Sequence, residues 1–268
     1  YILLVKRMES SWFALFDTVT NIYDYHQIIY KRVSNFLQKQ EDDDVNLFKM
    51  SEELQELEEI MDDLEFDGLD EIGRKSPIKI SEIVFIEDFE RDLRHDILAL
   101  KDLQENLGKL NEVIEKELTI KPNHHSADSK LQKLIEVITE ARKVNPERKL
   151  IIFSVFRDTA KYLYAQLRAR GFGKMALVSG TENQCTYKIS DRRSKDDCEP
   201  ILERFAPETK LYREKDWSDL YERQNVPEPK TFSEWKEIIK NHDSQTSNVL
   251  SEDLNLLIAT DCLSEGQN

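Results

Sequence analysis

Glycine, proline and cysteine are scarce in this sequence. The 268 residues include 7 glycines, 7 prolines and 3 cysteines. A sandwich or barrel of many short strands needs a chain-breaking residue at almost every turn, so the shortage of glycine and proline excludes that class of fold. The cysteines are odd in number and form no C-x-x-C pair, which argues against a disulfide framework and favours a reducing, cytoplasmic setting.

Long apolar runs and catalytic motifs are also missing. No run approaches the roughly 18–20 residues that a membrane span requires. There is no G-x-x-x-x-G-K-[ST] phosphate loop, G-x-S-x-G elbow, H-E-x-x-H helix or G-x-G-x-x-G fingerprint. We therefore expect no catalytic residue, metal site or membrane partner in this chain. It starts at Tyr1 and stops at Asn268 without a targeting leader, which we interpret as a piece cut from a longer protein.

Acidic residues dominate the chain, but only in its first half. The whole sequence carries 53 acidic and 38 basic residues, a net charge of −15. Residues 1–126 hold 29 acidic and 15 basic residues, a net charge of −14, which leaves −1 for residues 127–268. Because nucleic-acid binders are typically basic, the overall charge argues against such a partner, whereas the second half alone does not.

The first half predicts long helices. Apolar residues follow alternating steps of three and four over residues 5–36, 47–64 and 81–114. Narrow apolar stripes of this kind bury themselves against one another. We therefore expect residues 1–126 to form an elongated, acidic, all-helical bundle or arm.

An acidic stretch within this arm allows two interpretations. Between Glu41 and Glu71 there are fifteen acidic residues and one basic residue, Lys49. Such a run is usually a solvated helix face. It could instead be a docking surface for a basic protein partner, and the chain would then be a non-catalytic acidic helical adaptor.

The second half has the pattern of an α/β lobe. A polar stretch at residues 123–126 marks a boundary, and an amphipathic helix over residues 131–141 follows it. Three apolar runs are too short for helices, and a helix over residues 158–170 fits between the first two. Strand, helix and strand in this order predict a parallel sheet, with the first and third runs buried. The three runs are residues 150–156, 175–178 and 254–260.

Loops rich in serine, threonine and glycine follow these three runs, at residues 154–159, 179–184 and 260–268. Ligands of open parallel sheets bind beyond the carboxyl ends of the strands. Hydroxyls and backbone amides gathered there suit a phosphate-rich ligand, such as a nucleotide or a nucleic-acid backbone. Ordinary turn chemistry is the alternative explanation.

The strands and loops together resemble the second RecA-like lobe of superfamily 2 helicases, from motif IV to motif V. The similarity is closest to the Snf-type branch of double-stranded-DNA translocases, in its bacterial, RapA-like form. Residues 128–134 resemble the start of that lobe, and residues 6–11 resemble the segment after the first lobe. The matching motifs are residues 150–159, 177–181, 201–207 and 256–268.

The resemblance implies a domain organisation. Residues 127–268 would be the helicase C-terminal lobe, incomplete at its C-terminus and carrying a helical insertion at about residues 210–253. Residues 1–126 would be the helical insertion between the two lobes. The fold class expected is therefore α/β, a RecA-like parallel-sheet lobe preceded by an elongated all-α bundle.

The resemblance also implies a function. The longer protein would be an ATP-dependent helicase or translocase, a nucleoside triphosphate hydrolase that uses ATP and Mg²⁺ and binds double-stranded DNA. This chain lacks the Walker A, Walker B and motif VI segments, so it would not hydrolyse ATP alone. Glu265, Gly266 and Asn268 match nucleotide-binding positions. The positions that match DNA-facing residues are Ser154, Arg157, Ser179, Gly180, Thr181, Thr260 and Asp261.

Overall fold

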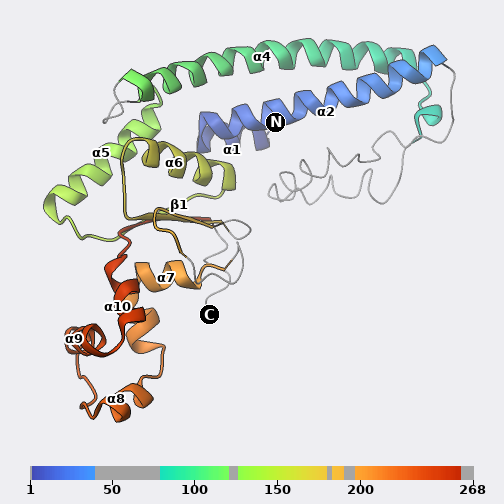
Figure 1. Cartoon of the computed structure of the whole chain (residues 1–268). Helices are drawn as coiled ribbons and strands as arrows, with labels where there is room; N and C mark the ends of the chain where they lie inside the picture. The colour runs from blue at the N-terminus through green and yellow to red at the C-terminus, as the bar shows by residue number, and fades with distance from the viewer. Residues whose placement is uncertain (1, 40–78, 121–125, 180–182, 190–196, 261–268) are drawn as a thin grey trace. The chain divides into compact units, whose positions relative to one another are not determined.

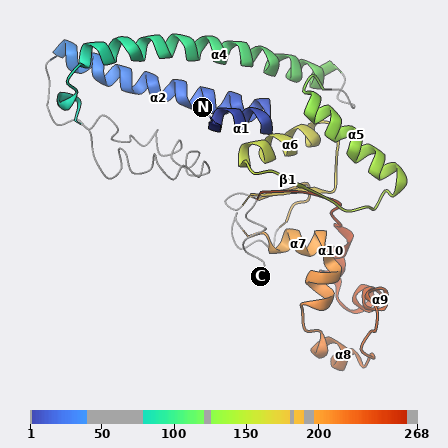
Figure 2. The same cartoon turned by 180° about the vertical axis from the view of Figure 1, so that it is seen from behind.

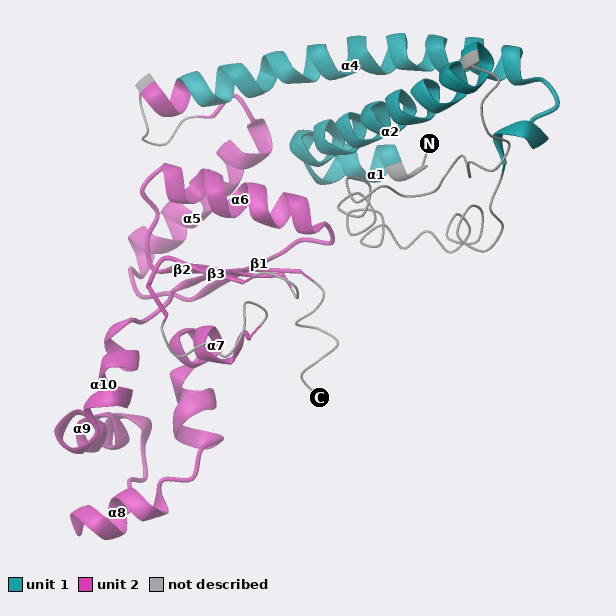
Figure 3. Cartoon of the chain, turned by 45° about the vertical axis from the view of Figure 1, so that its right-hand side comes forward, with its two compact units in different colours: residues 1–116 teal, residues 117–268 magenta. Residues whose placement is uncertain are grey.

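The computed structural model describes residues 2–39, 79–120, 126–179, 183–189 and 197–260. The chain divides into two compact units, residues 1–116 and residues 117–268 (Figure 3). The helix predicted over residues 47–64 and the acidic stretch from Glu41 to Glu71 lie outside the described residues. The assignment of these units to a helical insertion and a helicase lobe stays a prediction.

The first unit contains two long antiparallel helices, α2 (Trp12–Lys39) and α4 (Ile86–Ile120), with a short 3₁₀ turn, η1 (Ile80–Glu82), before α4. The Gln104 side chain donates to the Thr20 hydroxyl at 3.1 Å, and Arg94 donates to the Tyr30 hydroxyl at 3.2 Å. From the first contact to the second, the residue number increases along α2 and decreases along α4, so the two helices run antiparallel. Ile29 and Val33 of α2, Leu93 of α4 and Ile80 of η1 form one buried apolar cluster.

The prediction of one unbroken helix over residues 5–36 is wrong at Ser11. A separate helix, α1 (Ile2–Ser10), precedes α2. The Ser11 hydroxyl accepts a 3.0 Å hydrogen bond from the backbone N–H of Ala14. A serine oxygen bonded to the amide three residues later is the capping geometry that starts a new helix. The apolar period continues through this position, so periodicity alone does not reveal the break.

The second unit is built on a four-stranded sheet. Its strands are β1 (Leu150–Phe153), β2 (Met175–Val178), β3 (Gln184–Cys185) and β4 (Leu256–Ala259), in the order β1-β4-β2-β3. The pairs β1–β4 and β4–β2 are parallel, and β3 is antiparallel to β2. The prediction of a mixed α/β fold with a mostly parallel sheet is therefore confirmed. The short strand β3 was not predicted.

Helices cover both faces of this sheet. Helices α5 (Ser129–Val144) and α6 (Arg157–Ala169) lie on one face, and α7 (Glu199–Phe205) lies on the other (Figures 1 and 2). On the α7 face, Ile201, Leu202 and Phe205 pack against Ala176, Val178 and Leu257 in one buried cluster. Because helices cover both faces of the sheet at β2 and β4, every residue of these two strands is buried and apolar.

Strand β1 does not match the expectation of a buried strand. All four residues of β2 and all four of β4 are buried, whereas Ile151 is 50% exposed and Phe153 is 60% exposed. The reason is the strand order, since β1 lies at an edge of the sheet and α7 packs on β2 and β4. A continuous apolar run is thus compatible with an edge strand.

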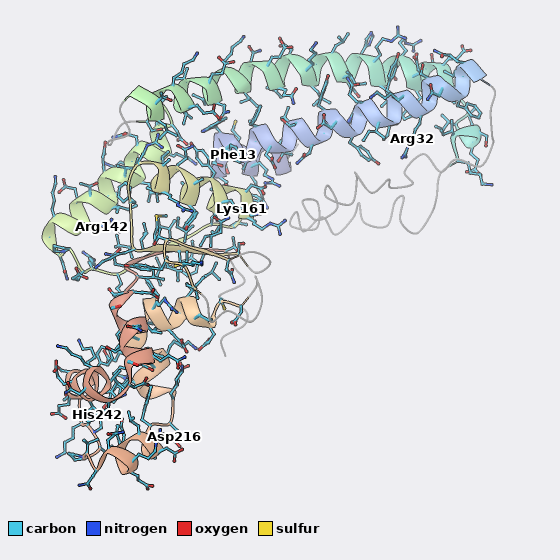
Figure 4. All side chains as sticks on the ribbon, in the orientation of Figure 1. Phe13, Arg32, Arg142, Lys161, Asp216 and His242 are labelled. Carbon is cyan, nitrogen blue, oxygen red and sulfur yellow. The ribbon has the colours of Figure 1, made fainter. Side chains whose placement is uncertain are left out.

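The segment expected as an insertion, about residues 210–253, is helical. A π-helical turn, η2 (Glu208–Arg213), leads to α8 (Ser218–Gln224), α9 (Phe232–His242) and α10 (Ser244–Ser251). Trp235 is completely buried in a small core of its own. Its ring stacks on Phe232 at 5.5 Å and meets Trp217 edge-on at 5.3 Å. We call this segment the inserted module; Asp216 and His242 are labelled on it in Figure 4.

Ion pairs fix the place where the inserted module returns to the sheet. The Arg204 guanidinium, at the end of α7, bonds the Glu252 carboxylate through Nε and Nη2, each at 2.8 Å. Lys149 bonds the Asp253 carboxylate at 2.5 Å and the Leu254 carbonyl at 2.9 Å. These contacts hold the residues that lead directly into β4.

Candidate nucleic-acid interface

Three of the predicted DNA-facing residues meet at the carboxyl edge of the sheet. Phe153, Ala259 and Val178 are in register across β1, β4 and β2. The next residue of each strand, Ser154, Thr260 and Ser179, therefore lies at the same edge. The Ser154 N–H donates to Ala259 O at 2.9 Å, and the Thr260 N–H donates to Val178 O at 3.1 Å. The sheet itself thus brings the three residues together, as the loop positions predicted.

Their polar groups are largely used within the protein. Ser154, Ser179 and Thr260 are all buried. The Ser154 hydroxyl donates to Phe156 O at 3.0 Å, which shapes the turn between β1 and α6. The Ser179 N–H donates to the Asn183 side-chain oxygen at 3.0 Å. These two bonds are internal to the protein and lie where β1 and β2 end.

Asn183 is a residue of this edge that the sequence did not single out. Its side chain is buried and closes the loop after β2 by accepting the Ser179 N–H. Asparagine commonly bonds a nearby backbone amide in loops, so an asparagine four residues after Ser179 was the available signal in the sequence.

A positive charge lies beside this edge. Arg157 is the first residue of α6 and is half-buried, three positions after Ser154. The first turn of a helix exposes backbone N–H groups and carries partial positive charge. A guanidinium at this place suits an anionic ligand. Among the predicted DNA-facing residues that the structure describes, Arg157 is the one with a charged side chain.

Six predicted contact positions lie outside the described residues. They are Gly180, Thr181, Asp261, Glu265, Gly266 and Asn268. The structure thus brings Ser154, Ser179 and Thr260 together with Arg157 in the neighbouring turn, and the nucleotide-binding positions stay predictions.

At the opposite, amino-terminal edge of the sheet, an arginine makes contacts within the protein. Arg142, near the end of α5 (labelled in Figure 4), donates to the Asn255 side-chain oxygen at 2.7 Å. Its guanidinium also stacks over the Phe172 ring at 5.4 Å, and burial lowers its pKa. The Arg142 guanidinium is therefore engaged within the protein. Because Asn255 directly precedes β4, this contact holds the start of that strand.

The described residues contain neither a metal-binding cluster nor a membrane-spanning helix. Among the described residues, no three or more His, Cys, Asp or Glu side chains gather in a way that could hold a metal ion. No helix in the described ranges combines the length and the apolar character that crossing a membrane demands. ATP and Mg²⁺ stay predictions from the sequence resemblance.

Comparison with known proteins adds no relative. The chain matches no protein-family model, no curated protein and no solved structure. The helicase resemblance therefore rests on the sequence motifs alone.

Proposed function

We propose that this chain supplies part of the second motor lobe of an ATP-dependent double-stranded-DNA translocase of the Snf type. The lobe would be the RecA-like α/β unit, and its carboxyl sheet edge would face the DNA backbone. The helices of residues 1–126 would form the insertion before it.

One observation supports this function most directly. Ser154, Ser179 and Thr260 come from three separate motifs, and register places them at one edge of three adjacent parallel strands. Loops at such an edge are where open α/β sheets bind their ligands. Sites of this kind bind phosphates through backbone amides, hydroxyls and arginine side chains.

The absence of a phosphate loop from this sequence bears on how the two lobes would share the binding of ATP. Without a phosphate loop, it does not hold the β- and γ-phosphates itself. A first lobe elsewhere in the longer protein would supply that loop and the Mg²⁺ ligands. The second lobe would contact the nucleotide through Glu265, Gly266 and Asn268. Opening and closing of the cleft between the two lobes would then move the DNA.

Binding of a fluorescein-labelled duplex to the purified chain, measured by anisotropy over a salt series, tests the DNA-facing role. Arg157→Glu reverses a charge beside the carboxyl edge. Arg148→Glu is the matched control, because it reverses an exposed charge just before β1, at the opposite edge. We expect Arg157→Glu to weaken binding and to reduce the slope of log K against log salt by about 1, the loss of one phosphate contact.

Two results would contradict the proposed function. The first is an absence of salt-dependent duplex binding by the unchanged chain at low salt. The second is an equal effect of Arg157→Glu and Arg148→Glu, because a general change of net charge would then explain the loss.

The alternative is a non-catalytic acidic adaptor for a basic protein partner. It is supported by the concentration of −14 of the net charge of −15 in residues 1–126. A labelled lysine-rich peptide offered in the same assay distinguishes the two functions. An adaptor binds that peptide and ignores DNA, whereas a motor lobe binds DNA through the carboxyl sheet edge.

A further inference from the structure

The inserted module has an apolar core that is separate from the core under the sheet. Leu211, Trp235 and Ile239 are buried in the core of the module. Leu202 and Leu257 are buried in the core under the sheet, and among the described residues the two clusters have no member in common. A segment that has its own core keeps its internal shape when its neighbours shift. The inserted module can therefore behave as one rigid body.

Two short non-helical crossings connect the inserted module to the rest of the second unit. At the first, the Ala206 N–H donates to Leu202 O in α7 at 2.7 Å, whereas the Ala206 carbonyl accepts from the Lys210 N–H at 2.9 Å. Ala206 (φ −128°, ψ 58°) is not helical, because Pro207 disfavours the helical conformation at the residue before it. The second crossing leads from Glu252, which caps α10, to β4. Hinges form at such element-terminal residues.

Ion pairs bridge the first crossing. Glu199 and Glu203 lie one turn apart on α7. The Lys210 Nζ of η2 lies 3.6 Å from a carboxylate oxygen of Glu199, and Lys215, shortly after η2, pairs with Glu203. Two lysines of the inserted module thus meet two carboxylates of α7.

Ion pairs of the opposite polarity bridge the second crossing. Here the acidic residues belong to the end of the module: Glu252 pairs with Arg204 of α7 at 2.8 Å, and Asp253 pairs with Lys149 at 2.5 Å. In each of the four pairs, at least one side chain is 33–47% exposed, so water and dissolved ions compete for it. A polar junction of this kind permits relative motion that a large apolar interface would prevent.

We propose that the inserted module is a movable part of the second unit, hinged at its two crossings and held in the position seen in the structure by an ion-pair latch. When the latch opens, the module swings as one body and its aromatic core stays intact. This conformational role does not depend on the proposed motor function. The pairs of the latch are Lys210–Glu199, Lys215–Glu203, Arg204–Glu252 and Lys149–Asp253.

Distances between two nitroxide labels, measured by pulsed electron paramagnetic resonance, test the latch. Unnatural amino acids carry the labels at Ser233, exposed on α9, and at Val137, 54% exposed on α5, so the native cysteines stay unchanged. Lys215→Glu sets a carboxylate against Glu203. We expect one narrow distance in the unchanged chain and an increase of about tenfold in the population of displaced positions in Lys215→Glu. Adding Glu203→Lys to that variant should restore the narrow distance.

Arg213→Glu is the matched control variant. It makes the same change of charge two residues from Lys215, but Arg213 pairs with Glu208, inside η2 itself. We expect its distances to match those of the unchanged chain. Near-ultraviolet circular dichroism should keep the aromatic signal of Trp217 and Trp235 in every variant, because none of the changes touches that core.

Four results would overturn the movable module. An unchanged distance distribution in Lys215→Glu would show that the ion pairs do not hold the module in place. A double variant as broad as Lys215→Glu would show that opposite charge is not what closes the latch. Equal broadening in Arg213→Glu would assign the effect to net charge. Broadening that is accompanied by loss of the aromatic signal would mean that the module unfolds instead of moving.

Discussion

Replacement of Arg204 by alanine should loosen the connection between the inserted module and the sheet. Arg204 is 5% exposed and lies in the last turn of α7, and its partner Glu252 lies shortly before β4. Two of its nitrogens bond one Glu252 oxygen at 2.8 Å, and Nη1 donates to Pro200 O at 2.9 Å. The alanine variant removes all three hydrogen bonds and the packed stem of the side chain.

The expected cost follows from how deeply each partner lies. Breaking a fully buried ion pair costs about 3–5 kcal/mol, because the remaining charge is left without its partner. The Glu252 side chain is 33% exposed, so water compensates part of that loss. We therefore expect Arg204→Ala to lower the free energy of unfolding of the second unit by about 2–3 kcal/mol. The double variant with Glu252→Ala should cost less than the sum of the single changes.

Urea unfolding followed by tryptophan fluorescence measures this effect. In a Trp12→Phe background, the remaining tryptophans are Trp217 and Trp235, both in the inserted module. Lys133→Ala is the control, since it breaks an exposed ion pair with Glu136 at 3.2 Å and should change stability by less than about 0.5 kcal/mol.

A loss below about 1 kcal/mol for Arg204→Ala would refute the reasoning, because it would mean that the buried contacts contribute no more than an exposed pair. So would strict additivity of Arg204→Ala and Glu252→Ala, since residues in direct contact should couple.

Three further changes test other parts of the fold. Ser11→Ala removes the cap on the Ala14 N–H and should cost about 1 kcal/mol in thermal unfolding; an unchanged melt would contradict a capping role. Asp128→Ala loses the bonds to the first turn of α5 and to the Tyr162 hydroxyl at 2.9 Å, so it should cost more than Tyr162→Phe, and the reverse order in urea titrations would count against it. Trp235→Ala empties the core of the inserted module at a cost of about 3–5 kcal/mol, and near-ultraviolet dichroism should lose its aromatic signal; a retained signal would show that Trp235 does not organise that core.

Local pattern determined much of what the sequence could predict. The long helices α2 and α4 follow from apolar residues at helical spacing, and the parallel strands follow from short apolar runs with a helix between them. The meeting of Ser154, Ser179 and Thr260 was predictable because parallel strands share a carboxyl edge.

Features that depend on contacts between distant parts of the chain could not be predicted from the local sequence pattern. A two-residue strand such as β3 is defined by its pairing with β2 and has no periodicity of its own. The exposure of Phe153 depends on strand order, which a run of apolar residues does not encode. The break at Ser11 is a capping contact laid over an uninterrupted apolar seam, and the loop-closing bond of Asn183 requires a folded loop.

Photocrosslinking to double-stranded DNA tests the DNA-facing sheet edge most directly. A benzophenone amino acid at Val155 lies beside the carboxyl end of β1, and the same group at Val144 lies before the strand, at the opposite edge. These valines are 72% and 82% exposed, so the two probes are equally accessible. A DNA-facing carboxyl edge predicts a several-fold higher DNA adduct yield at position 155 that falls with added salt. Equal yields, or a higher yield at position 144, would contradict it.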